Sequence, residues 1–209
     1  MPRSYTLSDQ ARAGRDARKQ GTRRALMDAA RAIAAERGID GVSVVEVGRR
    51  AGVSHSLINA YFDGKAGLIA ALVKDFNAPQ VAKSDEIADE DGPARERLRA
   101  ILTEWAAFDL ADPQLLRVLQ AHSWDWSDAA EAENREDRTA VLAPVGRVIL
   151  SGQSEGVFRK DLALDDVLPA IWAIYTLGMR DAVYDKPVRS AENAIAAIWG
   201  QIAALLFVR

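Results

Sequence analysis

The polar side chains between residues 54 and 65 are the ones whose types and spacing suit directed hydrogen bonding. They include an imidazole, a carboxamide and a phenol at His55, Asn59 and Tyr61, and a cationic amine follows at Lys65. Groups of this kind bond to base edges or to phosphate oxygens when a helix presents them to DNA. The chemistry that this segment offers is recognition.

A second candidate for chemistry is Gly152-Gln153-Ser154-Glu155-Gly156, which matches the Gly-x-Ser-x-Gly pattern of serine hydrolases. That pattern needs a strand before the serine and, in the usual chain order, a histidine after it. Both histidines of the chain, His55 and His122, precede Ser154, and the flanking pattern is helical. We predict the end of a helix running into a loop here, with a serine hydrolase as the alternative from another class.

Metal and cofactor sites are not indicated. The chain has no cysteine, and His122 with Asp125 gives one imidazole and one carboxylate, which is a poor ligand set. We predict no metal and no cofactor.

The elements that would position the polar segment are short helices. A helical pattern begins near Thr22 and is stopped by Gly38, and Ser43 and Glu46 have the spacing of a capping box for a second helix. A third helix begins near Ser54, and a fourth follows from Lys65 to Phe76. Gly52, between the second and third helices, can adopt the positive φ of a tight turn.

This arrangement is typical of a helix-turn-helix. The inward side chains would fix the crossing of the two helices, and they are Val47, Ala51, Val53, Ile58 and Phe62. The side chains left to face outward are His55, Ser56, Asn59, Ala60 and Tyr61. A generic helix pair explains the periodicity equally well.

The motif adds what periodicity does not provide. Residues 22–76 resemble the DNA-binding domain of the TetR (tetracycline repressor) family. The family's pattern is a Thr or Ser opening helix 2, then Ile-Ala, Ala-Gly-Val-Ser, a Tyr-x-His-Phe segment, a Lys and a Leu. The matching positions here are Ser43, Val47-Gly48, Ala51-Gly52-Val53-Ser54, Asn59-Ala60-Tyr61-Phe62, Lys65 and Leu68.

The resemblance implies which residues contact DNA: Ser43, Ser54, His55, Ser56, Leu57, Asn59, Ala60, Tyr61 and Lys65. Ser43 and Lys65 match phosphate contacts of the family, at the starts of two helices. Asn59 stands in place of the usual Tyr and Tyr61 in place of the usual His, so whether these two meet bases or phosphates stays open. Gly48 replaces Ala at a cost of about 1 kcal/mol in helix propensity, which closer helix packing would offset.

Charge is divided unevenly along the chain. The net charge of −3 resolves into +5 over residues 1–76 and −8 over residues 77–209. A basic head on an acidic body indicates that only the head meets a polyanion. Residues 1–20 are expected to form a flexible basic arm, in which the cations either solubilise the chain or follow DNA: Arg12, Arg15, Arg18 and Lys19. Arg49 and Arg50 are expected to be solvated.

The predicted fold is all-α, since no segment alternates convincingly with period two. It divides into the arm at 1–20, the helix-turn-helix domain at 21–77 and a C-terminal helical bundle at 78–209. The acidic segment 77–92 is interpreted as the connector between the two domains. Further helices are expected at about 93–111, 113–124, 128–155, 166–184 and 190–207.

The resemblance further implies that the C-terminal bundle dimerises and binds a small, partly hydrophobic effector. The candidate pocket residues are aromatic or carry polar tips: Trp105, Phe108, His122, Trp124, Trp126, Trp172, Tyr175 and Met179. The candidate dimer contacts come from the two most apolar helices: Trp172, Ile195, Ile198, Trp199, Ile202, Leu205 and Leu206. Core packing is the competing interpretation of the aromatic set.

The expected function is therefore a homodimeric repressor that leaves a palindromic double-stranded operator when the effector binds. A DNA-binding regulator that responds to no ligand is the alternative. No apolar stretch reaches the ~20 residues of a membrane span, and the N-terminus lacks the apolar core of a signal peptide. We expect a cytoplasmic protein with no membrane partner.

Overall fold

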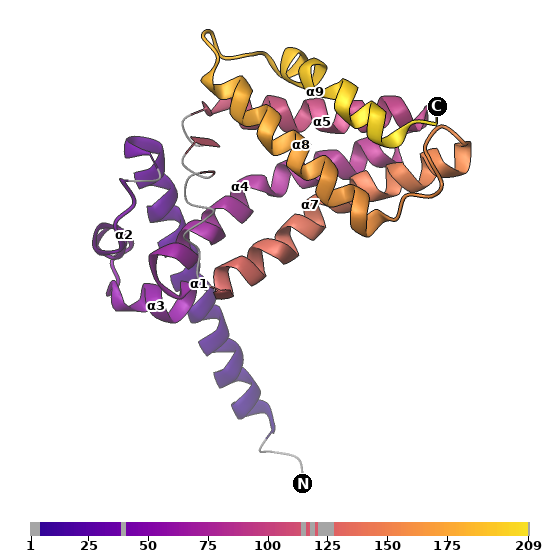
Figure 1. Ribbon diagram of the computed structural model, residues 1–209. Coiled ribbons are helices and arrows are strands. Elements are labelled where there is room, and N and C mark those ends of the chain that lie inside the picture. The colour runs from indigo at the N-terminus through magenta and orange to yellow at the C-terminus, as the bar shows by residue number, and fades with distance from the viewer. Residues whose placement is uncertain (1–4, 39–40, 114–115, 118–119, 121–127, 209) are drawn as a thin grey trace. The chain divides into compact units, whose positions relative to one another are not determined.

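The computed structural model describes residues 5–38, 41–113, 116–117, 120 and 128–208, and these residues are built from helices (Figure 1). The prediction of an all-α fold is confirmed: the described part of the chain has one isolated bridge, Phe158 with Phe207, and no strand. The helices are α1 (Tyr5–Arg37), α2 (Val44–Ala51), α3 (Ser56–Phe62), α4 (Gly64–Asp89), α5 (Ala94–Ala111), α7 (Asp128–Glu155), α8 (Leu164–Tyr184) and α9 (Ala191–Leu206).

The chain divides into two compact units, Met1–Asp75 and Phe76–Arg209. The first unit holds α1, α2, α3 and the start of α4, and the second holds the remainder of α4 with α5 to α9. Each unit has its own buried apolar residues.

The first unit is organised by two left-handed glycines. Gly38 ends α1 with φ 75°, and Gly52 ends α2 with φ 67°, where its N–H bonds back to the α2 carbonyls. Residues with a β-carbon rarely adopt these positive φ angles. The core between the helices consists of Leu26, Met27, Ala29, Ala30, Ile33, Val42, Val47, Ile58, Phe62, Leu68, Ile69 and Leu72.

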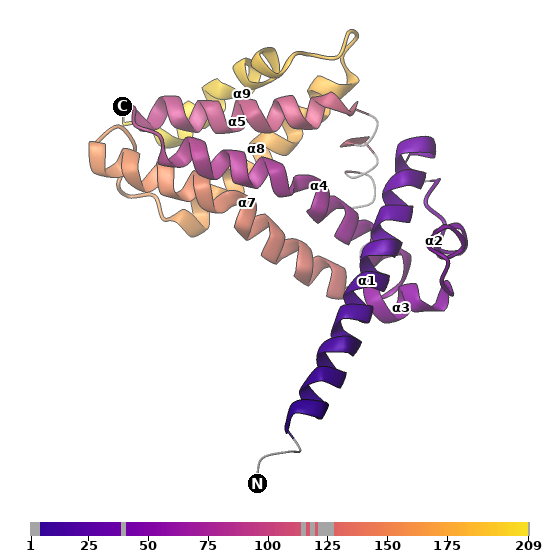
Figure 2. The same cartoon turned by 180° about the vertical axis from the view of Figure 1, so that it is seen from behind.

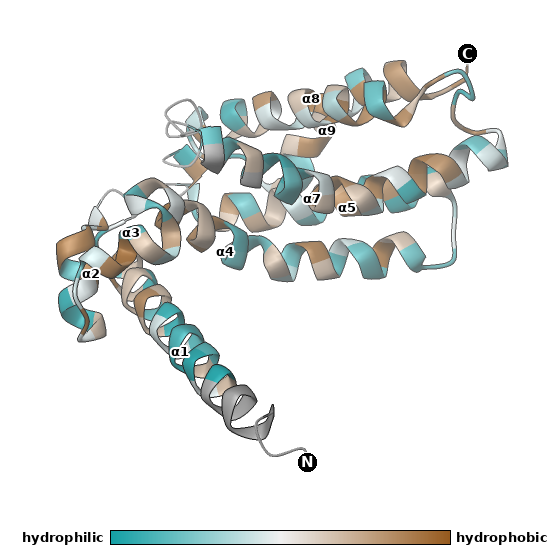
Figure 3. Ribbon diagram, turned by 90° about the horizontal axis from the view of Figure 1, so that it is seen from below, coloured by the Kyte–Doolittle hydropathy of each residue, from teal (hydrophilic) through white to brown (hydrophobic). Residues whose placement is uncertain are grey.

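Helix α1 corrects the prediction of a flexible arm. The helix begins at Tyr5 instead of near Thr22, so the described part of the arm is helical and continuous with the helix that packs in the core. No proline interrupts Tyr5–Arg37, and Ala and Arg, both good helix formers, recur along it. Residues 12–20 of α1 are all exposed, and hydrophilic residues predominate in the coloured part of α1 before it reaches the core (Figure 3). Polar composition was therefore mistaken for a lack of structure.

Helix α4 corrects the prediction of a connector at 77–92. It continues to Asp89 and accommodates Pro79 within it. Beyond the proline, the spacing of Gln80, Ser84, Ile87 and Ala88 places buried side chains on one face. The acidic residues occupy the other positions, so the segment is an amphipathic helix whose apolar face is short. The break comes later, at Gly92 and Pro93.

The second unit is a bundle in which α5 packs against α7, α8 and α9, and α8 packs against α9 (Figures 1 and 2). Its large core includes the fully buried side chains Trp105, Phe158, Ile149, Ile171 and Met179. Two glycines allow close contacts: a β-carbon at Gly178 would lie 2.4 Å from the Ile198 side chain, and one at Gly152 would lie 2.1 Å from the Phe158 ring.

The bounds of α5, α7, α8 and α9 agree with the predicted helices to within two residues. The helix predicted at 113–124 falls largely outside the described residues. No helix in the described ranges is long and apolar enough to cross a membrane.

Candidate nucleic-acid interface and ligand site

Helix α3 presents a row of exposed polar residues on one side of the first unit. The row and its flanks comprise Ser43, Ser54, His55, Ser56, Asn59, Ala60 and Lys65, all exposed, with Leu57 and Tyr61 half-buried. These are the nine residues predicted to meet DNA. The opposite side of α3 carries Ile58 and Phe62, which are buried. The predicted division on this helix is confirmed for the inward Ile58 and Phe62 and for the outward Ser56, Asn59 and Ala60, whereas Tyr61, predicted to face outward, is half-buried.

The backbone of the α2–α3 turn lies close to Gly48 of α2. A β-carbon at Gly48 would lie 2.9 Å from both the N and Cα atoms of His55 and 3.0 Å from the carbonyl oxygen of Val53. The Val53 N–H in turn donates to the Gly48 carbonyl at 3.0 Å. Gly48 thus permits a backbone approach that Ala would obstruct, which is the offsetting packing predicted for it.

The predicted capping box is not formed. Ser43 makes no side-chain cap at the start of α2, and the Glu46 carboxylate accepts instead from Arg49 at 2.8 and 2.9 Å and from Arg50 at 3.1 Å. Both oxygens of the Glu46 carboxylate thus bond guanidinium groups, instead of the backbone N–H of Ser43 that a capping box would use. The Ser43 hydroxyl is left at the surface.

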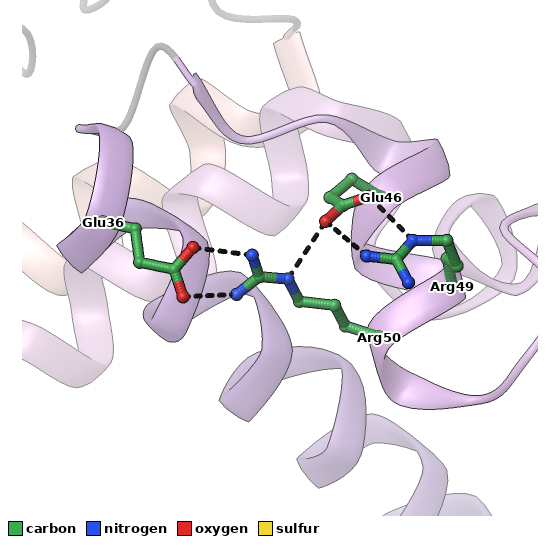
Figure 4. A network of polar contacts seen from close by, with 4 residues as sticks. All are labelled: Glu36, Glu46, Arg49 and Arg50. Atoms are coloured by element: carbon green, nitrogen blue, oxygen red, sulfur yellow. Dashed lines mark hydrogen bonds and ion pairs between the residues drawn. The ribbon is translucent and has the colours of Figure 1, made fainter.

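Arg50 joins α1 to α2 (Figure 4). Its guanidinium donates to both oxygens of Glu36, at 2.7 and 2.6 Å, and its Nε reaches Glu46. Hydrogen bonds from Arg49 and Arg50 lower the pKa of Glu46 to about 2, and those from Arg50 lower the pKa of Glu36 as well. Sequence reasoning expected solvated arginines and missed this bridge, because Glu36 and Arg50 are 14 positions apart.

The remaining basic groups of the first unit lie on α1 and at the start of α4. The arm cations Arg12, Arg15, Arg18 and Lys19 are exposed along α1. Further along the helix, the Arg23 guanidinium lies over the Phe62 ring, 5.0 Å from its centroid. Lys65 follows the left-handed residues Asp63 and Gly64, which turn the chain from α3 into α4.

The structure brings together several of the predicted pocket residues in the second unit. Ring centroids are separated by 5.4 Å between Trp105 and Tyr175, 6.2 Å between Trp105 and Trp172, and 6.3 Å between Trp172 and Tyr175. Met179 is buried one turn further along α8, and Phe108 is half-buried on α5. The other three predicted residues, His122, Trp124 and Trp126, lie outside the described residues.

Asp109 is a member of this cluster that sequence reasoning missed. The Tyr175 hydroxyl donates to its Oδ2 at 2.7 Å, and burial raises the pKa of the Asp109 carboxyl to about 6. Burial also raises the pKa of Tyr175, followed by the repulsion of the nearby carboxylate. The available signal was Asp109 itself, a carboxylate four residues after Trp105 on one face of an apolar helix.

The predicted dimer residues of α9 are corrected. Ile195, Ile198, Trp199, Ile202 and Leu206 are at most 8% exposed because they belong to the core of the second unit. Leu205 and Trp172 are half-buried. The outward face of α8 and α9 consists of other residues, including Leu177 with 60% exposure and a run of small ones: Ala173, Ala196, Ala197, Gly200 and Ala204.

The Gly152–Gly156 pentapeptide lies at the end of α7, as predicted. Ser154 is exposed in the last helical turn, Gly156 ends the helix with φ 76°, and Gly152 packs beneath Phe158. The glycines thus have packing and turn roles. Among the described residues, no group of three or more His, Cys, Asp or Glu side chains could hold a metal.

Comparison with known proteins agrees with this geometry. Residues 26–72 match the family described as "Bacterial regulatory proteins, tetR family". The chain is 31% identical over 120 residues to the HTH-type transcriptional regulator BetI of Klebsiella pneumoniae (strain 342), an alignment that covers 48% of this chain and 62% of BetI. The chain spans less than two thirds of the length of the first curated relatives that it matches.

Two ligand-bound structures share the fold. Thermus thermophilus FadR, a TetR-family repressor in complex with lauroyl-CoA, aligns with a TM-score of 0.74 and 16% identity, over 90% of this chain and 96% of FadR. RolR in complex with resorcinol aligns with a TM-score of 0.69 and 20% identity, over 89% of each chain. Residues 26–72, which run from α1 into α4, therefore match the family model of the TetR regulatory proteins, and the chain as a whole shares the fold of these two structures.

Proposed function

We propose that this chain is a DNA-binding transcriptional regulator whose first unit recognises an operator through α3. The observation that carries the proposal is that α3 has one buried face and one exposed face. Ile58 and Phe62 anchor α3 in the core, while His55, at its start, Ser56 and Asn59 are exposed and can contact base edges. Ser43 and Lys65, at the starts of α2 and α4, are proposed to bind phosphates on either side of α3.

The basic face of α1 extends the proposed interface. Arg15, Arg18 and Lys19 are exposed on a helix, so they form a semi-rigid cationic rod in place of a loose arm. Such a rod follows DNA phosphates with less loss of conformational freedom on binding than a disordered arm would suffer. Arg49 is the less suitable cation, because Glu46 already neutralises it.

The second unit is proposed to sense a small molecule and to dimerise. FadR and RolR, which share the fold, have been crystallised with lauroyl-CoA and resorcinol. The aromatic cluster of Trp105, Trp172 and Tyr175 offers a similar place here for a ligand with an apolar part. The effector would act as an inducer by binding better to the conformation that does not fit DNA.

Dimerisation is proposed to use the outward face of α8 and α9, where small residues and Leu177 leave apolar surface uncovered. Two first units related by a twofold axis would read a palindrome whose half-sites are one helical turn, ~34 Å, or a multiple of it apart. We further propose that residues 1–20 and 21–77 serve DNA binding and residues 78–209 serve sensing, that the chain is not an enzyme, and that it acts in the cytoplasm.

The test is selection of bound duplexes from a random DNA pool by the full chain, followed by affinity measurements on the enriched sequence. We expect a palindrome, and we expect Asn59→Ala or His55→Ala to relax the preference at one position of each half-site by about 1–3 kcal/mol. An exposed residue of the second unit, Lys160, supplies the control Lys160→Ala. Failure to enrich any sequence would reject operator recognition, and enrichment of a single non-repeated site would reject the dimer.

The ligand-independent alternative is separated by a second measurement on the same duplex. Fractions of cell extract, and then the compounds within them, are screened for release of the selected operator. Release that depends on a small molecule supports the inducible repressor, whereas operator occupancy unchanged by every fraction supports a constitutive regulator.

A further inference from the structure

Among the described residues, the carboxylate of Asp109 in the second unit has no counter-charge. Its one partner in the described part of the chain is the Tyr175 hydroxyl, 2.7 Å from Oδ2, and none of the described lysine or arginine side chains pairs with it. The group is a carboxylate at neutral pH, since its pKa is about 6. An anion in a site of low dielectric is costly unless a positive charge balances it.

The surroundings of Asp109 are aromatic. Trp105 meets Tyr175 edge to face at an interplanar angle of 81° and Trp172 at 72°, so the three rings form a corner. The indole N–H of Trp105 is already used, because it donates to the Ser84 hydroxyl at 2.8 Å, and that hydroxyl donates to the Gln80 carbonyl at 2.8 Å. The cluster therefore offers aromatic rings and one carboxylate to a ligand.

Part of the cluster reaches the surface. Tyr175 and Trp105 are buried, but Trp172, Asp109 and Phe108 are only half-buried. A ligand could thus contact an aromatic face and the carboxylate without unfolding the bundle. The faces of aromatic rings carry negative potential, so the rings and the carboxylate both favour a cationic ligand.

We propose that Asp109, with the rings of Trp105, Trp172 and Tyr175, binds an organic cation whose ammonium group is attached to an apolar body. This inference rests on the proposed function and names the chemical class of its effector. The carboxylate supplies the charge that an ammonium group needs once it leaves water, and the rings supply cation–π contact and apolar surface. An anionic ligand would meet repulsion, and a neutral one would leave the carboxylate unbalanced.

The proposal is tested with three probes of one shape. Benzyltrimethylammonium is the cation, neopentylbenzene replaces its nitrogen by carbon, and phenylmethanesulfonate is the anion. Binding to the full chain is followed by calorimetry and by tryptophan fluorescence. We expect the cation to bind at least tenfold more tightly than either other probe. Equal binding of neopentylbenzene, or no binding of the cation, overturns the proposal.

Two variants assign the preference to this site. Asp109→Asn removes the charge and keeps an acceptor for Tyr175, and it is expected to abolish the tenfold preference. Trp172→Leu, at a half-buried position, is expected to weaken the cation at least threefold more than neopentylbenzene. The control is Asp181→Asn, an exposed carboxylate on α8 whose removal leaves the preference intact. A preference that survives Asp109→Asn overturns the proposal.

Operator binding without any probe separates this inference from the function on which it depends. If the chain and Asp109→Asn both bind the selected duplex but the cation shows no preference, the ligand class is wrong and the regulator stands. If no duplex is selected, the regulatory proposal fails, whatever the probes do.

Discussion

The two units place their polar side chains in opposite ways. In the first unit, the polar residues of α3 lie outside a small core and face solvent. In the second, Tyr175 is buried and Asp109 half-buried beside indole rings, and burial shifts the pKa of both. A surface that meets a long polyanion must be open and need not be tuned, because counterion release supplies most of the affinity. A site for a small molecule is largely removed from water, so the surrounding protein sets the charge state of its ionisable groups.

The largest predicted effect is a loss of folding stability when the core of the second unit is changed. Trp105→Ala removes a fully buried side chain, its contacts with two rings and its bond to Ser84, and it should cost about 3–5 kcal/mol of unfolding free energy. Urea unfolding followed by circular dichroism measures this cost. The control is Leu150→Ala, at a side chain 52% exposed on α7, which should change stability by less than about 0.5 kcal/mol. Equal effects would mean that Trp105 is not a core residue.

A pH-dependent effect should follow at Asp109. Its folded pKa of about 6 lies above the ordinary 3.8, so the fold favours the protonated form. The stability linked to this group is therefore present below about pH 3.8 and is lost as the pH rises through 6. Asp109→Asn does not titrate, and its stability relative to the parent chain should increase by about 3 kcal/mol in total as the pH rises from well below 3.8 to well above 6.

The measurement is a pair of urea titrations, at pH 4 and at pH 7.5, on both proteins. Tyr175 stays protonated throughout, since its pKa is raised further above its usual value. A stability difference that is the same at both pH values would show that the Asp109 carboxyl is solvated. Asp109 in the second unit would then be as accessible to water as the polar residues of α3 in the first.

A third test concerns the first unit, where the backbone of the α2–α3 turn lies close to Gly48. Gly48→Ala gains up to about 1 kcal/mol of helix propensity but forces a methyl group against the backbone of His55, and overpacking of this kind costs about 1–3 kcal/mol. We expect a net loss of stability and weaker operator binding. Gly21→Ala is the matched control, because Gly21 lies within α1 with nothing within 4 Å, and it should stabilise the chain. A stabilising Gly48→Ala would disprove the tight turn.

Sequence patterns predicted local features well and contacts between distant residues poorly. The Ala51–Ser54 turn and the inward set around Ile58 follow from periodicity and from glycine's access to positive φ, both of which are local. Glu46 shows the limit. Its spacing from Ser43 favours a cap, but the contact that forms also involves Arg50, and Arg50 in turn bonds Glu36 on another helix.

The same limit explains the errors in the second unit. Apolarity alone marked Ile195, Ile198 and Ile202 as interface residues, since a sequence does not reveal whether a buried side chain faces its own protomer or a partner. Asp109 was missed because its significance comes from Tyr175, 66 positions away on α8. Segment 77–92 was misread because its acidic residues masked the apolar spacing that buries Ser84 and Ile87.

The smallest expected effect concerns the exposed surface of the first unit that is proposed to bind DNA. Lys65 is exposed at the start of α4, and if it binds a phosphate, Lys65→Ala should weaken binding to every duplex by a similar factor. It should also reduce the slope of log affinity against log salt by about one, because one fewer counterion is released. Fluorescence anisotropy between 50 and 200 mM salt, with the selected and a scrambled duplex, measures both effects. Lys160→Ala, in the second unit, should leave the slope unchanged. If Lys65→Ala instead alters the preference among sequences, the residue takes part in reading bases, and the division between anchoring flanks and a reading α3 must be redrawn.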